Sequence, residues 1–458
     1  MFKFLKFSFI FSLFILVGVH KSQAQYAINA IEIEGNHKTK AYIIYRELPY
    51  KVGDVISKDS LSILNTIAQS QLVNTTLFNE VIVSVNELDS THAKIKIQVK
   101  ERWYFFPLPY FRWVDRNFSQ WWNEQNRSLD RVNYGVNFRQ SNFTGNNDKL
   151  VLGLITGYTQ QAIVRYQFPF IDKKLHFGLG AGFQYLTQKE INYTTQNDKQ
   201  VFYKTDGVIR SGYRANLNLS YRPNLFERHS FQIGFGEDRI SDSAFLKEPR
   251  LLPSYAKSMS YADLSIAFSK SRFNYNAYPT QGNSTEFIAF QRIAAAGNLT
   301  SFQFRKIKAH SFSKTNFIYV ESNSIFKILP NQNYNDQKLM GYGNMQMNGL
   351  EYYVIEGNAG TILKASFNHS LGSITVPNIL TSKYLPNIKY DFWVKVFSNL
   401  GYAYNAHPLS SNKLSNTLLR TAGIGIDIIS IYDFVLKVDY SVNQLGDKGL
   451  YLHGGINF

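Results

Sequence analysis

The sequence predicts a mainly β protein: a 16-stranded antiparallel transmembrane β-barrel preceded by one small α+β domain of order β-α-α-β-β. Three observations carry this prediction. Aromatic residues make up 16% of the 458 residues, although the mean hydropathy is only −0.23. From about residue 104, segments of about ten residues alternate apolar with polar or small side chains, as membrane barrel strands do. After residue 24 no run of 18 apolar residues occurs, so any membrane crossing must use strands.

The first 24 residues have the pattern of an export signal. Lys3 and Lys6 precede a 13-residue apolar core, Phe7–Val19, which is shorter than the roughly 18 residues of a spanning helix. Small residues at Ser22-Gln23-Ala24 predict cleavage before Gln25. The alternative is a short N-terminal membrane anchor.

Composition narrows the function classes further. The chain has no cysteine, which excludes disulfides, thiolate metal sites, cysteine nucleophiles and cysteine-linked lipids. The net charge is +16. In an exported protein this charge is expected to meet the bilayer's anionic lipid headgroups or anionic sugars, and we expect no nucleic acid partner.

Residues 25–102 predict the α+β domain and carry equal numbers of basic and acidic residues. Apolar residues in the Ile28–Ile33 segment indicate a first strand, and helices are expected with Thr39 and Ser57 as N-caps. Two further strands are indicated by alternation, one through Val81, Val83 and Val85 and one over residues 95–99.

The same segment resembles the polypeptide-transport-associated (POTRA) domain. The similar stretches are IEIEGNHKTKAYIIYREL, LVNTTLFNEVIVSV and AKIKIQVKER. They include the Gly-Asn turn, the Arg46-Glu47-Leu48 helix end and the closing Val-x-Glu-Arg. The resemblance implies one POTRA domain in the periplasm.

Residues 103–458 predict the barrel. In the last strand, Leu450, Leu452 and Gly454 share one face with Ile456 and Phe458, while polar and small residues share the other. Roughly 20–25 residues for each strand with its connection give 14 to 18 strands, and even numbers are favoured. We therefore expect 16.

Several barrel segments resemble the BamA/TamA-type outer-membrane assembly family and its two-partner-secretion relatives. The stretch SRFNYNAYPTQGNSTEF looks like the family's periplasmic turn, with Pro279 and Gly282 setting the bend. The segment from Asn331 to Gly360 resembles the large surface loop that folds back into the lumen; an ordinary hairpin loop is the alternative.

The resemblance also implies a latch between that loop and the barrel wall. Where the family has an arginine, this chain has Asn348, followed by Gly349. The residues of the pattern that lie on the barrel strand are Gly423, Gly425 and Asp427, and the alternation of apolar and polar residues predicts that they face the lumen. We expect the two glycines to admit the loop backbone and Asn348, or a neighbouring amide, to lie near Asp427. Lys338 is a candidate substitute cation.

The expected seam joins the first and last strands. Pro107 and Pro109 remove two N–H groups from one edge of a first strand within Tyr104–Val114, and Gly454 and Gly455 weaken packing in the last strand. The family's lateral gate lies at this junction. Alternatively, Trp103–Pro109 is only the linker from the first domain.

We expect no enzymatic activity and no cofactor. The nine histidines are scattered, and no H-E-x-x-H, G-x-S-x-G, Walker or dinucleotide motif is present. His453 with Asp439 or Asp433 is better explained as a solvated lumenal residue. The C-terminal Phe458 resembles the signal by which barrel proteins are recognised for insertion.

These patterns together predict a bacterial outer-membrane protein that acts on unfolded outer-membrane or secreted polypeptides. A client strand is expected to add to the edge formed by Val81, Val83 and Val85. The alternatives are a secretion pore or passive channel, and a non-catalytic subunit among other subunits of an envelope complex.

Overall fold

The structure is a computed structural model that describes residues 25–115, 118, 120–382 and 385–456. The predicted signal peptide and the C-terminal Phe458 lie outside the described residues. Among the described residues, no helix combines the length and the apolar character needed to cross a membrane.

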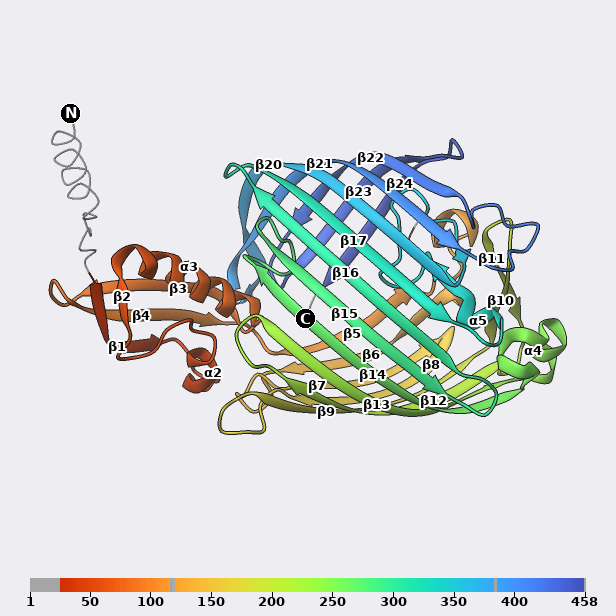
Figure 1. The fold of residues 1–458 in the computed structure, drawn as a ribbon, viewed down its shortest axis with the longest axis horizontal. Helices are drawn as coiled ribbons and strands as arrows, with labels where there is room; N and C mark the ends of the chain where they lie inside the picture. Colours follow the sequence, from red (N-terminus) through yellow and green to blue (C-terminus); the bar gives the residue numbers. More distant parts are fainter. Residues whose placement is uncertain (1–24, 116–117, 119, 383–384, 457–458) are drawn as a thin grey trace, which may run out of the picture.

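The N-terminal domain has the two predicted helices and the three predicted strands, and a short additional strand between the helices makes its sheet four-stranded (Figure 1). The sheet order is β2-β1-β4-β3, so β3 is an edge strand. Its elements are β1 (Gln25–Glu34), α2 (Ala41–Tyr45), β2 (Val55–Ser57), α3 (Lys58–Asn74), β3 (Phe78–Glu87) and β4 (His92–Glu101).

The two predicted helix caps have different outcomes. Ser57 caps α3, because its side chain accepts a hydrogen bond from the Ser60 amide at 3.3 Å. Thr39 does not cap α2, whose N-cap is Lys40 with no side-chain bond. The Thr39 hydroxyl instead contacts the hydroxyl of Tyr104 at 3.0 Å and accepts from the Asn142 amide at 2.9 Å. The residue thus joins the domain to the barrel.

The rest of the chain forms one 16-stranded antiparallel sheet rolled into a barrel, which confirms the predicted fold class (Figure 1). Neighbours along the chain are neighbours in the sheet, apart from two short hairpins that lie outside the wall. The strands are β5 (Phe105–Trp113), β6 (Val132–Ser141), β7 (Lys149–Gly157), β8 (Thr159–Phe168), β9 (Phe177–Gln188), β12 (Arg210–Tyr221), β13 (Glu227–Ile240), β14 (Ser258–Phe273), β15 (Gly282–Ile293), β16 (Leu299–Ser311), β17 (Asn316–Ile328), β20 (Ala359–Ser382), β21 (Leu385–Tyr404), β22 (Leu418–Ile429), β23 (Phe434–Asn443) and β24 (Lys448–Ile456).

The two ends of the barrel differ. The near end, which carries the N-terminal domain, has short turns after β6, β8, β12, β14 and β22. The far end has longer connections with structure of their own. These are the hairpin β10 (Glu190–Gln196) and β11 (Lys199–Lys204), helix α4 (Asp242–Lys247), helix α5 (Tyr334–Gln337) and the pair β18 (Lys338–Met340) and β19 (Ile355–Glu356).

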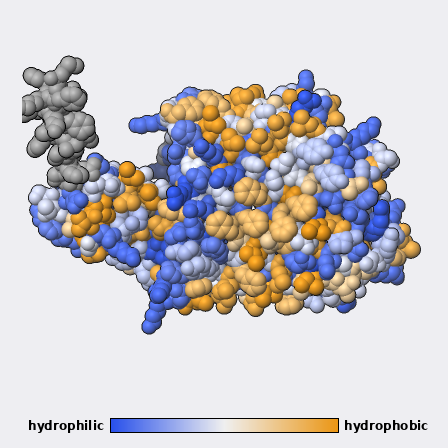
Figure 2. All heavy atoms as spheres, in the orientation of Figure 1, coloured by the Kyte–Doolittle hydropathy of each residue, from blue (hydrophilic) through white to orange (hydrophobic). Residues whose placement is uncertain are grey.

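The outer wall is apolar, as the alternation predicts. Each of the 16 strands exposes at least one large hydrophobic side chain, for example Leu154, Phe235, Val396 and Leu450. Figure 2 shows these apolar residues gathered over the wall, with hydrophilic residues toward the N-terminal domain. The alternate positions face inward, where Tyr451 is 2% exposed and neighbouring Leu450 is 64% exposed. This distribution suits a barrel surrounded by lipid.

Candidate functional site

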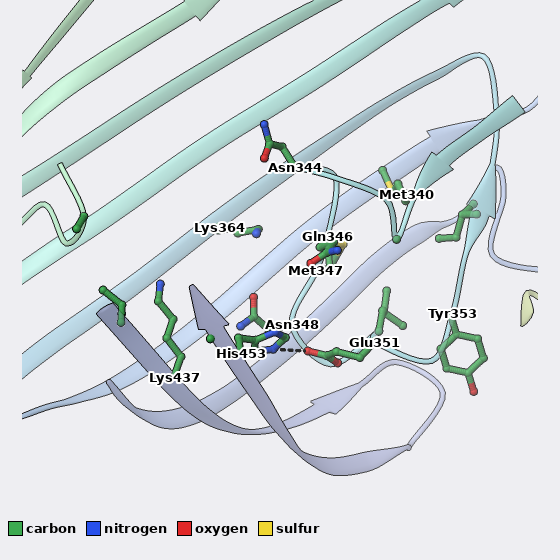
Figure 3. Close-up of a pocket in the computed structure, with 16 residues that line it drawn as sticks. Met340, Asn344, Gln346, Met347, Asn348, Glu351, Tyr353, Lys364, Lys437 and His453 are labelled. Atoms are coloured by element: carbon green, nitrogen blue, oxygen red, sulfur yellow. Dashed lines mark hydrogen bonds and ion pairs between the residues drawn. The ribbon is translucent and has the colours of Figure 1, made fainter. Parts of the chain in front are cut away.

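The far-end loop between β17 and β20 enters the lumen, which confirms the expectation for this segment (Figure 3). Its apolar residues pack on the inner wall of β20, β21 and β22. This cluster comprises Leu339, Met340, Met345, Met347, Leu350, Ile355, Ile362, Ala403, Leu414 and Leu419. Two wall glycines make the space: a Cβ on Gly401 would lie 2.4 Å from Met347 Sδ, and one on Gly360 would lie 2.8 Å from Leu339. Hydrophobic burial therefore holds the loop inside.

The loop is also latched by polar contacts, but not to the expected partner. The Asn348 side-chain amide donates to Asp439 on β23 at 2.7 Å, rather than to Asp427 on β22. The Gly349 carbonyl accepts from the Asn443 side chain at 2.9 Å. Gly349 adopts φ +94°, and a Cβ there would lie 3.2 Å from Thr421 and 3.3 Å from Ser441 Oγ. Glycine is required at this turn because its conformation is unfavourable for other residues.

Asp427 belongs to an ion-pair network in the wall. Lys395 on β21 contacts Asp427 at 2.7 Å and Asp439 at 2.8 Å, and all three side chains are at least 93% buried. Lys395 therefore supplies the positive charge beside Asp427. The expected substitute, Lys338, lies in β18 against the rings of Tyr334 and Tyr342.

The predicted role of Gly423 and Gly425 is also corrected. A Cβ on Gly425 would meet Asp439 Oδ1 at 2.1 Å and Lys395 Cε at 2.8 Å, and one on Gly423 would meet the Phe397 ring at 2.6 Å. These glycines make room for side chains of the wall rather than for the loop backbone. They let the ion pair form in the plane of the wall.

The near-end turn between β14 and β15 fills the other side of the lumen. It is the predicted turn: Gly282 has φ +116°, and a Cβ there would clash with the Arg272 carbonyl. Its Tyr278 points inward and donates to Asp427 at 3.0 Å. The ring packs on Phe317 and Trp393, with centroids 5.7 and 5.9 Å away. Burial and the neighbouring Asp427 raise the pKa of Tyr278, so its hydroxyl remains a donor.

His453 contacts the inserted loop. Its Nε2 lies 3.1 Å from Glu351, as Figure 3 shows, and not beside Asp439 or Asp433. The adjoining cavity of about 490 Å³ is lined by loop residues together with Lys364 and Lys437. In the part of the chain that the structure describes, no group of three or more His, Asp or Glu side chains could hold a metal ion.

The seam-facing edge of β5 carries the two prolines. Tyr104 O accepts from Ser141 N, and Val114 N donates to Arg131 O, both at 2.9 Å. Even-numbered residues of β5 therefore bond to β6 in this regular antiparallel register. Odd-numbered residues, including Pro107 and Pro109, turn their backbone groups toward the open edge. Both missing donors thus belong to the seam, and Pro107 and Pro109 lie in a strand rather than in a linker.

The other side of the seam is β24. Asn443 N donates to Asp447 O at 3.1 Å, which assigns odd-numbered residues of β24 to the ladder with β23. Gly454 therefore faces the seam through its backbone, whereas Gly455 pairs with Val435 on β23. The sheet order ends at β24 and β5, and the described residues form no paired register between them. This junction is the weakest line in the wall.

A buried ion pair ties the near end of the seam. Arg102, which precedes β5, donates to both carboxylate oxygens of Asp433 at 2.8 and 3.2 Å. The side chains are 8% and 4% exposed. Asp433 lies in the turn before β23 and also accepts from Tyr275 at 2.6 Å. Because Arg102 belongs to the β5 side and Asp433 to the β23–β24 side, the pair spans the seam.

A second buried ion pair docks the N-terminal domain on the barrel. Arg222, in the turn after β12, donates to both oxygens of Glu47 at 2.5 and 2.7 Å. Neighbouring Arg46 donates to the backbone carbonyls of Leu175 and Arg222 at 3.1 and 3.0 Å. Burial, and then the charge of Arg222, lower the pKa of Arg46 to about 10. The domain is therefore held in one orientation.

The client edge predicted at Val81, Val83 and Val85 lies on β3, the open edge of the small sheet. Leu88 N donates to His92 O at 2.9 Å, so even-numbered residues of β3 bond to β4 and the three valines turn their backbone groups to the open edge. The Val81 carbonyl accepts from Gln69 at 2.9 Å. The valine side chains face the domain core.

Sequence reasoning missed Lys395 and did not predict the ion pairs that Asp439, Arg102 and Asp433 form. Alternation identifies Lys395 and Asp439 as lumenal, but only the strand register brings them together. Arg102 lies within the quoted Val-x-Glu-Arg motif, which is the one signal that marks it. Its partner Asp433 lies 331 positions further along the chain, and no sequence pattern marks the pair.

The comparisons with known proteins agree with this architecture. Residues 26–102 match the POTRA family, described as a surface antigen variable number repeat. None of the curated proteins compared with the sequence matches it.

Three solved structures are similar over 94% of this chain. BamA from Haemophilus ducreyi lacking POTRA domains 1–3 is 15% identical, with 84% of its chain covered and a TM-score of 0.51. CdiB from Escherichia coli is 10% identical, with 75% covered and a TM-score of 0.55. CdiB from Acinetobacter baumannii is 13% identical, with 73% covered and a TM-score of 0.50. The POTRA domain and the barrel fold expected from the resemblance to the BamA/TamA-type family are confirmed.

Proposed function

We propose that this protein assists the insertion or translocation of other polypeptides at a bacterial outer membrane, without catalysing a chemical reaction. The premise is a POTRA domain joined to a 16-stranded barrel, the architecture shared with BamA and CdiB. The apolar outer wall supports a place in the membrane, and the docked POTRA domain then lies in the periplasm. Its expected partners are unfolded outer-membrane or secreted polypeptides.

The observation that favours a role in assembly over a role in secretion is the seam between β5 and β24. Two prolines remove donors from the open edge of β5, and the described residues of β5 and β24 form no paired register. A client strand could pair with either edge through main-chain hydrogen bonds, which are indifferent to sequence. The POTRA edge at Val81–Val85 would receive the client first. Since the periplasm supplies no nucleotide, the client's own folding and burial drive the step.

The alternative is a secretion pore. The lumen is occupied by the loop from the far end and by the Tyr278 turn from the near end. A polypeptide that threads through the barrel would have to displace both segments and break their hydrogen bonds to Asp427 and Asp439. An opening seam requires neither, so the geometry supports lateral assembly better.

Depletion of the protein tests this choice. Assembly predicts that several barrel proteins accumulate unfolded in the periplasm while the secretion of soluble proteins continues. A pore predicts the loss of one secreted partner with normal barrel proteins. Membranes should also be extracted in mild detergent, because stable co-purification with several envelope proteins would favour a structural subunit.

A further inference from the structure

One wall of the lumen carries an unpaired basic cluster. Lys149 on β7, Arg165 on β8, Arg214 on β12 and Arg228 on β13 line a single cavity of about 670 Å³. The strands β7, β8, β9, β12 and β13 are consecutive in the wall. The strand between Arg165 and Arg214, β9, lines the cavity with Gly180 and Gly182, and a Cβ on Gly182 would lie 2.7 Å from Asn216 Oδ1.

Several other lumenal cations are paired with close acids. Arg305 contacts Glu321 at 2.8 Å, Arg292 contacts Asp263 at 2.8 Å, and Lys395 contacts two aspartates. In contrast, the cluster cations form no ion pair within the described residues. Arg165 bonds only to Gln184 at 3.3 Å and Arg214 to the Tyr261 hydroxyl at 3.1 Å.

The acids around the cavity do not compensate the cluster. Glu286 is the one carboxylate that lines it, against four cations. Like charges held together on one wall repel one another, and a cavity lined by one sign of charge concentrates ions of the opposite sign. The three arginines are exposed to the cavity, so their donors are available to a ligand.

The cavity is reached from the near end. A second cavity of about 310 Å³ lies between the POTRA domain and the barrel, and both cavities are lined by Lys149, Gln167, Ser220, Arg228 and Ser269. A soluble ligand on the POTRA side therefore meets Arg228 and Lys149 first. Headgroups of the surrounding bilayer cannot reach these side chains, because the wall separates them from the lipid.

We propose that this cavity binds a small soluble polyanion whose phosphate or carboxylate groups pair with the arginines. Guanidinium groups form two parallel hydrogen bonds to either oxyanion, which a row of exposed arginines can repeat along one ligand. The binding is a property of the resting barrel and does not depend on the proposed function.

Isothermal titration of the purified full chain in non-ionic detergent at low ionic strength tests the inference. Pyrophosphate and citrate are titrated separately, to distinguish phosphate from carboxylate ligands. The variant R165Q/R214Q/R228Q should raise the Kd at least tenfold. The matched control K51Q/K173Q/K174Q removes three exposed cations outside the lumen and should change the Kd less than twofold.

Saturable binding of either anion that is lost in the lumenal variant alone supports the site and identifies the ligand class. No saturable binding by the unaltered protein overturns the inference, as does equal weakening in the control. If the triple variant does not give a heat-modifiable folded barrel, R228Q alone is used, with an expected Kd increase of about threefold. An unchanged Kd in R228Q would then overturn the site.

Discussion

Replacing Asp433 with asparagine should release the Arg102 side chain and loosen the near end of the seam. The substitution keeps the shape of the side chain but removes the charge that two donors of Arg102 contact at 2.8 and 3.2 Å. Arg102 is 8% exposed, so its guanidinium would remain buried without a counter-charge. Breaking one partner of a buried pair costs about 3–5 kcal/mol. This corresponds to roughly two to three and a half orders of magnitude in the equilibrium between the buried and released states of the Arg102 side chain.

Limited trypsin digestion measures that equilibrium. The bond after Arg102 is protected while the side chain is buried, and the cleavage rate follows the population of the released state when reclosing is fast. We expect trypsin to cleave D433N after Arg102 at least ten times faster than it cleaves the unaltered protein. The product is detected as a fragment that begins at Trp103.

The control is E87Q in the POTRA domain. Glu87 pairs with Lys58 at 2.8 Å, but both side chains are more than half exposed, so the cleavage rate should not change. Equal cleavage of D433N and the unaltered protein would refute the role of Arg102 as a clamp across the seam.

Four further variants test the lumen and the seam. K395M leaves two buried carboxylates without a cation and should lower the free energy of unfolding by about 3–5 kcal/mol. N348A removes one hydrogen bond and should lower it by about 1–3 kcal/mol. Thermal unfolding, followed by heat-modifiability, compares the two variants, and an equal loss of stability would contradict the ion-pair network. G401V should expel the loop between β17 and β20, because its Cβ would overlap Met347 Sδ. Proteolysis of this loop should then be faster than in the unaltered protein, and an equally protected loop would refute the packing of Met347 on Gly401. P107A with P109A restores two backbone N–H donors to the seam, each of which can add a hydrogen bond that stabilises the closed seam by about 0.5–1.5 kcal/mol. The variant should therefore slow client insertion into vesicles, and faster insertion would contradict the account.

Much of the fold was predictable because it follows from local periodicity. Alternation with a period of two identified Leu450 as lipid-facing and Asp427 as lumenal, and chain length limited the strand number to roughly 14 to 18, a range that contains the observed 16. The fold of a membrane barrel is constrained by closure of backbone hydrogen bonds, which leaves few solutions. The loop's entry into the lumen was implied by family resemblance rather than by periodicity.

The latch was only partly predictable, because contacts between lumenal residues depend on register. Asn348 bonds to Asp439 on β23 rather than to the expected Asp427 on β22. In the strand register Gly425 lies opposite both Asp439 and Lys395, so Asp439 is two residue positions along the strands from Asp427. Alternation gives the face of a residue but not its neighbour on the next strand. The Arg102–Asp433 pair joins distant turns and has no local signature.

Cysteine cross-linking across the seam tests the central claim most directly. Because the chain has no cysteine, one cysteine placed within Phe105–Trp113 and one within Lys448–Ile456 can form only one disulfide within a molecule, the one that joins them. Pairs that cross-link on oxidation are selected, and client insertion is measured before and after reduction. The account predicts that oxidised protein loses insertion activity and that a reductant restores it. Full activity in the cross-linked protein would contradict an opening seam.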